Sequence, residues 1–124
     1  MSQAVRVVLV EDNEVYRSSL ELLLGMQHGI EIVGVADTAR AASAIVDQLR
    51  PDIVVTDFRL PDADGVSTTN ALRATDASPT VICLTAEATQ AEGEAVLAAG
   101  AVALVEKGVP IGELATVIRS AAGW

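Results

Sequence analysis

The sequence predicts an α/β domain built on a parallel, doubly wound sheet. Over 124 residues, five short apolar runs rich in β-branched residues alternate with five stretches of helical periodicity. Most of the runs are apolar throughout rather than alternating, which is typical of strands that are covered on both faces. Five strand–helix units in this length predict one ordinary domain over residues 1–124, with right-handed crossovers.

The expected strands are runs bounded by turn residues, and the expected helices fill the stretches between them. The predicted strands cover residues 5–10, 30–35, 52–57, 80–84 and 102–105. The predicted helices cover residues 13–26, 38–49, 65–74, 88–99 and 110–122. Side chains that favour helix starts mark each helix in order: Asn13, Thr38, Asp64, Thr89 (inside the fourth helix) and Pro110.

Helix ends are marked as well. Gly100 and Gly123 follow helical patterns and suit left-handed caps, because glycine tolerates positive φ. The pair Arg50 and Pro51 stops the second helix, since a residue before proline is disfavoured in helical geometry.

The first helix carries an apolar face wider than the stripe of an ordinary surface helix. Its members are Val15, Tyr16, Leu20, Leu22, Leu23, Leu24 and Met26. One interpretation is burial against both the sheet and the fifth helix, and the other is a surface that faces a partner.

The composition and net charge of the chain disfavour several classes of function. No apolar run approaches the ~18 residues of a membrane span, and the N-terminus lacks a basic region and a cleavage signal, so we expect a soluble cytoplasmic protein without a membrane partner. Cys83 is the only cysteine and is predicted to be a core thiol. The net charge of −9 argues against a grip on nucleic acid by this domain itself, so DNA would be contacted only through another domain.

Carboxylates follow the first and third predicted strands. Glu11 and Asp12 come after residues 7–10, and Asp57 comes after residues 53–56. If these strands are neighbours, the three acids converge at the sheet edge where open α/β sheets bind ligands. At ~5 Å and an effective dielectric of ~20, each like-charge pair costs about 3 kcal/mol. The cluster therefore predicts a site for a hard divalent metal ion.

Three strand ends carry further candidate chemistry. Asp57 opens a loop punctuated by proline and glycine, and a carboxylate beside a divalent cation can act as a nucleophile and form an acyl phosphate. Thr85 could hydrogen-bond a phosphoryl oxygen, and Lys107 could pair with phosphate or carboxylate. Taken alone, each also fits a turn or a surface position. Asp62 and Asp64 are interpreted as turn and N-cap residues.

The spacing of these motifs resembles the receiver domain of two-component response regulators over essentially the whole chain. The residues that carry the resemblance are Val8–Glu14, Asp52–Gly65, Leu84–Ala86 and the stretch from Gly100 and Ala101 to Lys107. The resemblance implies a flavodoxin-like (βα)5 sheet with strand order 2-1-3-4-5.

The resemblance also implies roles. Asp57 would be the phosphoacceptor, taking a phosphoryl group from a sensor histidine kinase. Mg²⁺ would be bound directly by Asp12, by Asp57 and by the Arg59 backbone carbonyl, with Glu11 acting through water. Thr85 and Lys107 would hold the phosphoryl oxygens. The domain would then be a switch rather than an enzyme, with only self-catalysed phosphoryl transfer and autodephosphorylation.

Two segments narrow the resemblance to the NarL/FixJ class, whose members are usually followed by a helix-turn-helix DNA-binding domain of LuxR type. They are Asp57–Pro61 and Ile118–Trp124. The output would be transcriptional control through a domain that does not fit within these residues. We expect a receiver excised from a longer regulator rather than a stand-alone one, and a homodimer is an allowed assembly.

Departures from the family pattern support an alternative function. Leu104 stands where an aromatic residue is common, and Gly108 stands where proline often follows the lysine. Glu106 could pair with Lys107 or repel the phosphoryl site. The alternative is an interaction module of this fold that works without phosphorylation.

Two further possibilities are set aside. A flavin or nucleotide enzyme is disfavoured because residues 11–14 are acidic where phosphate binding needs glycine or hydroxyl donors. His28 is predicted to be a solvated loop residue.

Overall fold

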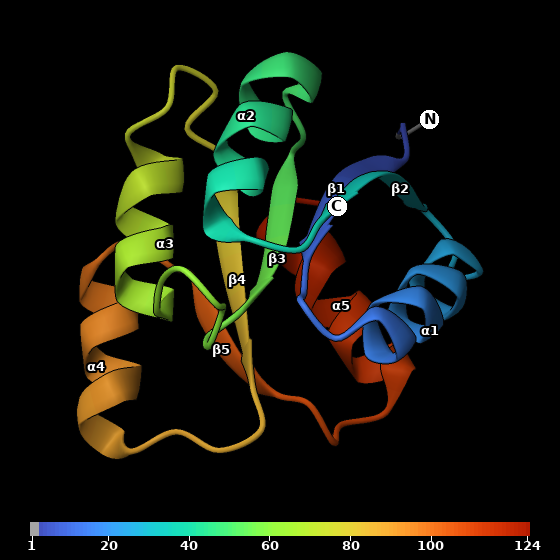
Figure 1. Cartoon of the computed structure of the whole chain (residues 1–124). Coiled ribbons are helices and arrows are strands. Elements are labelled where there is room, and N and C mark those ends of the chain that lie inside the picture. Colours follow the sequence, from blue (N-terminus) through green and yellow to red (C-terminus); the bar gives the residue numbers. More distant parts are fainter. Residues whose placement is uncertain (1–2) are drawn as a thin grey trace.

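The computed structural model describes residues 3–124 and confirms the predicted fold class. Five parallel strands form one sheet in the order β2-β1-β3-β4-β5, as the resemblance implied (Figure 1). The strands are β1 (Val5–Val10), β2 (Ile30–Ala36), β3 (Ile53–Asp57), β4 (Thr80–Thr85) and β5 (Ala103–Glu106). The helices are α1 (Glu14–Gly25), α2 (Ala39–Leu49), α3 (Gly65–Arg73), α4 (Gln90–Ala98) and α5 (Ile111–Ala121). The predicted limits of the elements differ from these by two residues at most.

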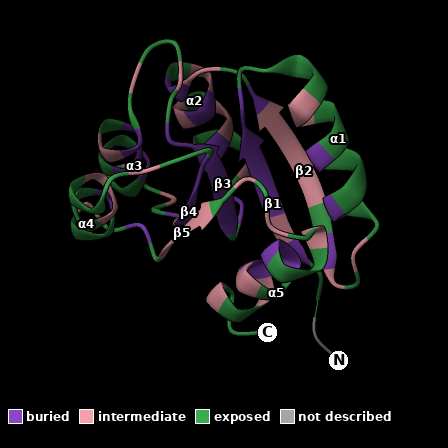
Figure 2. Ribbon diagram, turned by 90° about the horizontal axis from the view of Figure 1, so that it is seen from below, coloured by how far each residue is buried: buried purple, intermediate pink, exposed green. Residues whose placement is uncertain are grey.

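The helices form two layers around the sheet, and each layer closes one apolar core. Strand residues alternate between the faces, so that Val7 and Leu9 of β1 join one core cluster while Val8 and Val10 join the other. The first cluster contains residues of α1 and α5, and the second contains residues of α2, α3 and α4. Figure 2 shows the buried central strands β1, β3 and β4 between helices whose outer faces are exposed, while the edge strands β2 and β5 are mostly half-buried.

The strand order reverses beside β1, and this reversal positions the site. The chain passes from β1 outward to β2, then returns across β1 to β3 on its other side. The loops after β1 and β3 therefore leave the sheet toward opposite helix layers and open a crevice between them. Any side chain at the ends of these two strands is directed to that crevice.

Helix ends follow the predicted signals. Asn13, Thr38, Asp64 and Thr89 each accept a backbone N–H of the first helical turn, whereas Pro110 makes no side-chain cap bond. Thr89 was expected inside the fourth helix but is its N-cap, because its side chain and that of Glu92 satisfy each other's backbone amides. Gly100 and Gly123 have positive φ as predicted, and Arg50 ends α2 in the left-handed region.

The broad apolar face of α1 is not fully buried, so the interpretation of burial against the sheet and α5 is wrong for part of it. Leu20 and Leu24 are buried, but Val15, Leu22 and Met26 are 78%, 64% and 74% exposed. Helix α1 lies at the side of the molecule beside β2 and α5 (Figure 1), so a single face meets the core. The outer residues form an apolar surface that fits the second interpretation, a face for a partner.

Cys83 is fully buried, and burial together with the charges of Asp57 and Asp64 raises the pKa of its thiol to about 12. The interpretation as a core thiol is therefore confirmed. Within residues 3–124, no helix has both the length and the apolar composition that a bilayer crossing requires.

Gly65 is closely packed against two buried side chains. A methyl group placed on Gly65 would lie 2.5 Å from the Phe58 ring and 3.0 Å from Cys83 Sγ, both buried. We therefore predict that Gly65→Ala lowers the free energy of unfolding by about 1–3 kcal/mol through overpacking. Gly112→Ala is the control, since nothing lies within 4 Å of its added carbon and alanine favours helix. Urea unfolding of both variants measures this free energy, and an equal change in the two variants would contradict the packing argument.

Candidate functional site

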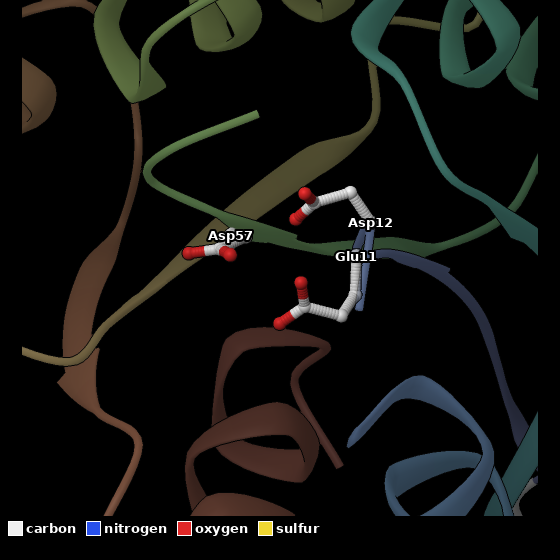
Figure 3. Close-up of side chains that lie close together, drawn as sticks. All are labelled: Glu11, Asp12 and Asp57. Atoms are coloured by element: carbon white, nitrogen blue, oxygen red, sulfur yellow. The ribbon is translucent and has the colours of Figure 1, made fainter. Parts of the chain in front are cut away.

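The carboxylates predicted to converge lie together at the ends of β1 and β3. Val10 pairs with Thr56, so Glu11 and Asp57 follow at neighbouring positions of the sheet edge. One oxygen from each of Glu11, Asp12 and Asp57 lies within 4.8 Å of the others. Figure 3 shows the three side chains extending from the two strand ends toward a common space. We call these three residues the carboxylate cup.

Burial differs within the cup. Glu11 and Asp57 are 2% and 7% exposed, while Asp12 faces solvent. The Glu11 carboxylate accepts the backbone N–H of Asn13 at 3.1 Å, which fixes its direction. Two nearly buried anions and one at the mouth make a site that is open on one side only.

Lys107 supplies the positive charge of the cup. It follows β5 directly, and its backbone N–H donates to the Thr85 carbonyl at 2.9 Å. Its ammonium donates to Glu11 Oε1 at 2.6 Å and to Asp57 Oδ2 at 2.9 Å. Burial lowers the pKa of Lys107, but the hydrogen bonds and charges of Glu11 and Asp57 outweigh it and raise the pKa overall. The lysine therefore stays cationic at neutral pH.

Thr85 lies in the same pocket, but its hydroxyl is engaged elsewhere. The hydroxyl donates to the Glu87 carbonyl at 2.9 Å and accepts the Glu87 backbone N–H at 3.2 Å. The cavity has a volume of about 570 Å³. Its lining residues are Asp57, Arg59, Thr85, Ala86, Glu87, Ala88, Thr89, Glu92 and Lys107. Thr85 thus faces the space beside Asp57 while its hydroxyl holds the loop after β4.

Arg59 connects the loop after β3 to helix α4. Its backbone N–H donates to Asp57 Oδ1 at 3.4 Å, and its guanidinium donates to Glu92 Oε2 at 2.9 Å. Hydrogen bonds from the Thr89 backbone, followed by the Arg59 guanidinium, lower the pKa of Glu92. The same carboxylate therefore caps α4 and accepts the Arg59 guanidinium, and both residues line the pocket. That the Arg59 carbonyl is a metal ligand stays a prediction.

Sequence reasoning missed several residues that shape the site. The Tyr16 ring lies under the Lys107 ammonium, 4.7 Å from ring centroid to nitrogen. Arg17 donates to the Glu11 carbonyl at 2.8 Å, which ties the loop after β1 to α1. Both lie one helical turn beyond the acidic pair. Tyr16 was assigned only to the apolar face, and a long-range contact to Lys107 leaves no local sequence signal.

Asp62 has a second role besides the predicted one of a turn residue. Its carboxylate accepts the backbone N–H groups of Ala39 and Arg40 at 2.9 and 3.0 Å, and these bonds lower its pKa. It thereby caps the first turn of α2 from a distant loop. Asp64 caps α3 through the Ser67 backbone N–H, as predicted.

The other residues that the sequence analysis singled out lie outside the carboxylate cup. Leu104 is half-buried and packs in the second core cluster. Glu106 is exposed, and the ion pairs of Lys107 within residues 3–124 are with the cup. Gly108 is exposed and follows a trans peptide, since residues 3–124 contain no cis bond. His28 is an exposed loop residue, as predicted, and its ring meets Trp124 edge to face.

The donor set of the cup fits a hard divalent cation. Carboxylate oxygens are the protein ligands that Mg²⁺ prefers, and Mg²⁺ typically takes one or two of them and keeps several waters. Three such groups within 4.8 Å and an exposed Asp12 at the mouth leave room for bound water. The described residues of the cup contain no histidine or thiol that would favour a softer metal.

Comparison with known proteins gives the family. Residues 7–119 match the family described as response regulator receiver domain. The chain belongs to this family, in which receiver domains bind Mg²⁺ in the acidic pocket and interact with sensor histidine kinases. It is therefore a receiver domain of a response regulator of a two-component system.

Curated relatives carry the domain within longer proteins. A protein-glutamate methylesterase/protein-glutamine glutaminase of Anaeromyxobacter dehalogenans is 36% identical over 119 residues, covering 94% of this chain and 35% of the relative. The DNA-binding transcriptional activator DevR/DosR of Mycobacterium tuberculosis is 45% identical over 62 residues, covering 50% of this chain and 29% of the relative. The chain thus spans about a third of the length of these relatives.

Solved structures agree in fold over nearly the whole chain. The signal receiver domain of the response regulator NarL from Mycobacterium tuberculosis has a TM-score of 0.92 at 25% identity, covering 98% of both chains. The receiver domain of a sensor histidine kinase from Pseudomonas aeruginosa PAO1 has a TM-score of 0.84 at 29% identity, covering 98% of this chain and 99% of the other. The latter structure has a magnesium ion coordinated in its active site cleft.

Crowding of like charges in the cup has a measurable consequence for stability. Lys107 pairs with Glu11 and Asp57, so Asp12 is the carboxylate without that partner. We predict that Asp12→Asn raises the free energy of unfolding by about 0.5–1 kcal/mol in metal-free buffer, because it removes one repelling charge. Added Mg²⁺ should stabilise the unsubstituted protein more than this variant.

Asp47→Asn is the control, since Asp47 is an exposed carboxylate on α2 with the same charge change. It should leave both the metal-free stability and the Mg²⁺ response close to those of the unsubstituted protein. Urea unfolding with and without Mg²⁺ measures both quantities. If Asp12→Asn and Asp47→Asn behave alike, the repulsion argument is wrong.

Proposed function

We propose that Asp57 is the phosphoacceptor of this receiver domain. A carboxylate oxygen of Asp57 forms a bond to phosphorus while the bond from phosphorus to a histidine nitrogen of the sensor kinase breaks. The electron pair of that bond leaves with the nitrogen, and the product is an acyl phosphate. Hydrolysis of the acyl phosphate returns the carboxylate and resets the switch.

The other side chains of the pocket have supporting roles in this proposal. Glu11, Asp12, Asp57 and the Arg59 carbonyl would hold Mg²⁺, with Glu11 acting through water, and the bound ion would neutralise phosphoryl oxygens. Lys107 would exchange a carboxylate partner for a phosphoryl oxygen. Thr85 would turn its hydroxyl from Glu87 to another phosphoryl oxygen, since both hydrogen bonds of that hydroxyl are to the backbone of one loop residue.

One observation carries the proposal: the only carboxylate of the cup that both lies nearly buried and lines the large pocket is Asp57. Glu11 is buried but is not among the residues that line this pocket, and Asp12 is exposed and does not line it either. A nucleophile needs room for an incoming phosphoryl group, and the cavity of about 570 Å³ beside Asp57 provides it.

The partner that delivers the phosphoryl group is proposed to be a sensor histidine kinase. The exposed apolar residues Val15, Leu22 and Met26 lie on α1 and its C-cap, and this helix begins two residues after Asp12 of the cup. Exposed apolar area of this kind is typical of a protein-binding face. A second copy of the chain is the alternative occupant, which would make the domain a homodimer.

The output is proposed to be transcriptional control of the NarL/FixJ kind, through a helix-turn-helix domain in a longer regulator of which residues 1–124 are the receiver. The similarity to DevR/DosR and to the NarL receiver supports this assignment. The net charge of −9 is consistent with DNA contact being made by another domain. The methylesterase relatives offer the competing output, a regulated enzyme.

Phosphorylation can be tested on the domain alone. Incubation with Mg²⁺ and a small acyl-phosphate donor should add one phosphoryl group, detected by intact mass. Asp57→Asn should abolish the addition, because an amide is not a comparable nucleophile. Asp76→Asn, at an exposed carboxylate in the turn before β4, is the control and should be labelled like the unsubstituted protein.

Two results would redirect the proposal. Equal labelling of Asp57→Asn would mean that another residue is the acceptor. A lack of both Mg²⁺ binding and labelling in the unsubstituted protein would favour the alternative module that works without phosphorylation.

The output prediction requires the complete reading frame that encodes this chain. We predict that its product binds DNA in a gel-shift assay and that phosphorylation changes the apparent affinity. Asp57→Asn in the same product should bind without responding to the phosphodonor. Absence of DNA binding in either form, together with hydrolysis of a protein methyl ester, would identify the methylesterase output instead.

A further inference from the structure

Lys107 has a third partner in addition to the two carboxylates. Its ammonium lies 4.7 Å from the centroid of the Tyr16 ring, within the range of a cation–π contact. These are the single lysine and the single tyrosine of the chain. The ammonium is thus held by two anions of the cup and by one neutral ring face.

We propose that Tyr16 is a positioning residue for the phosphoryl transfer proposed above, holding the Lys107 ammonium at the cup by its ring face. The inference rests on that proposed function for its catalytic consequence. The contact itself is independent of whether any phosphoryl group is transferred.

The need for such a residue follows from competition within the cup. The hydrogen-bonding anions of Lys107, Glu11 and Asp57, both belong to the set that would hold a divalent cation. Metal binding would weaken both ion pairs, and a lysine side chain has four rotatable bonds and a strongly hydrated head. The ring face does not bind Mg²⁺, so it would keep the ammonium within reach of Asp57 after the carboxylates are taken.

The position of Tyr16 is fixed by the start of α1. Its backbone N–H donates to the Asn13 side chain at 2.9 Å, which is the N-cap bond of the helix. Its side chain is half-buried and packs against the core layer that α1 and α5 share. Burial raises the pKa of Tyr16, with the charge of Lys107 opposing that rise, so the phenol is neutral at physiological pH. The ring therefore presents a fixed and uncharged face.

The contact can be observed directly because the chain has one lysine. Protein labelled with ¹³C-lysine gives one side-chain spin system, and protons above an aromatic face resonate upfield. We expect an upfield shift of the Lys107 ε protons in the unsubstituted protein. Tyr16→Phe should keep the shift, and Tyr16→Leu should lose it. A shift that is the same in all three proteins would overturn the contact.

Phosphorylation by the acyl-phosphate donor with Mg²⁺ gives the second readout. We expect Tyr16→Phe to be labelled within about twofold of the unsubstituted rate, since the ring face remains. Tyr16→Leu should be labelled roughly 10- to 100-fold more slowly, the range that follows from a misplaced group. A purely structural tyrosine would instead give equal rates for the two variants, and that result would overturn the positioning role.

Leu23→Ala is the matched control. Leu23 lines the same small cavity as Tyr16 between α1 and α5, and it has no contact with the ammonium among the interactions of the described chain. This variant should keep both the lysine shift and the labelling rate. Urea unfolding verifies that each variant is folded. If the unsubstituted protein takes no phosphoryl group, the proposed function fails, while the lysine shift still decides whether Tyr16 holds Lys107.

Discussion

The ion pairs of Lys107 with Glu11 and Asp57 are the interaction on which the site depends. They join residues 96 and 50 positions apart, from the ends of β1, β3 and β5. Without a cation, the buried carboxylates at neighbouring strand ends would repel each other in a partly desolvated space. Because the lysine neutralises them, the fold can keep two anions buried and one exposed at the same edge. The sheet order then has a direct chemical result, a negatively charged cup with a cation beside it.

Much of this arrangement could be predicted because it follows from topology. In a parallel sheet, every residue that follows a strand lies at one edge, so the positions of Glu11, Asp57, Thr85 and Lys107 after apolar runs place them together once the order is known. Caps such as Asn13 could also be predicted, since a cap acts within one helical turn. Local sequence patterns and the residues at strand ends were therefore sufficient to predict the fold and the carboxylate cup.

Features that depend on two distant segments could not be predicted in the same way. Asp62 caps α2 from the loop after β3, and Arg59 reaches Glu92 on α4. Neither contact has a fixed spacing, because its geometry depends on where the crossovers bring the helices. The same reason explains why the exposure of Val15 and Met26 was open: amphipathic width indicates how much of a helix is apolar, while the neighbouring elements decide how much is covered.

Under the proposed function, Leu104 bears on how a charge added at Asp57 would be transmitted. An aromatic side chain at position 104 could exchange positions beside Thr85. Leu104 instead packs among apolar residues and opposite Gly93, where a Cβ added to Gly93 would lie 3.5 Å from the leucine side chain. The connections among residues that line the pocket are polar instead: the Thr85 hydroxyl with the Glu87 backbone, and the Arg59 guanidinium with Glu92. Under the proposed function, phosphoryl oxygens would attract that hydroxyl and that guanidinium, since both are hydrogen-bond donors. Helix α4 has Val96 as its buried residue, and its first turn is capped by Thr89 and Glu92, of which Glu92 also accepts the Arg59 guanidinium. The response to phosphorylation would therefore pass to α4 by exchange of hydrogen-bond partners rather than by movement of a ring.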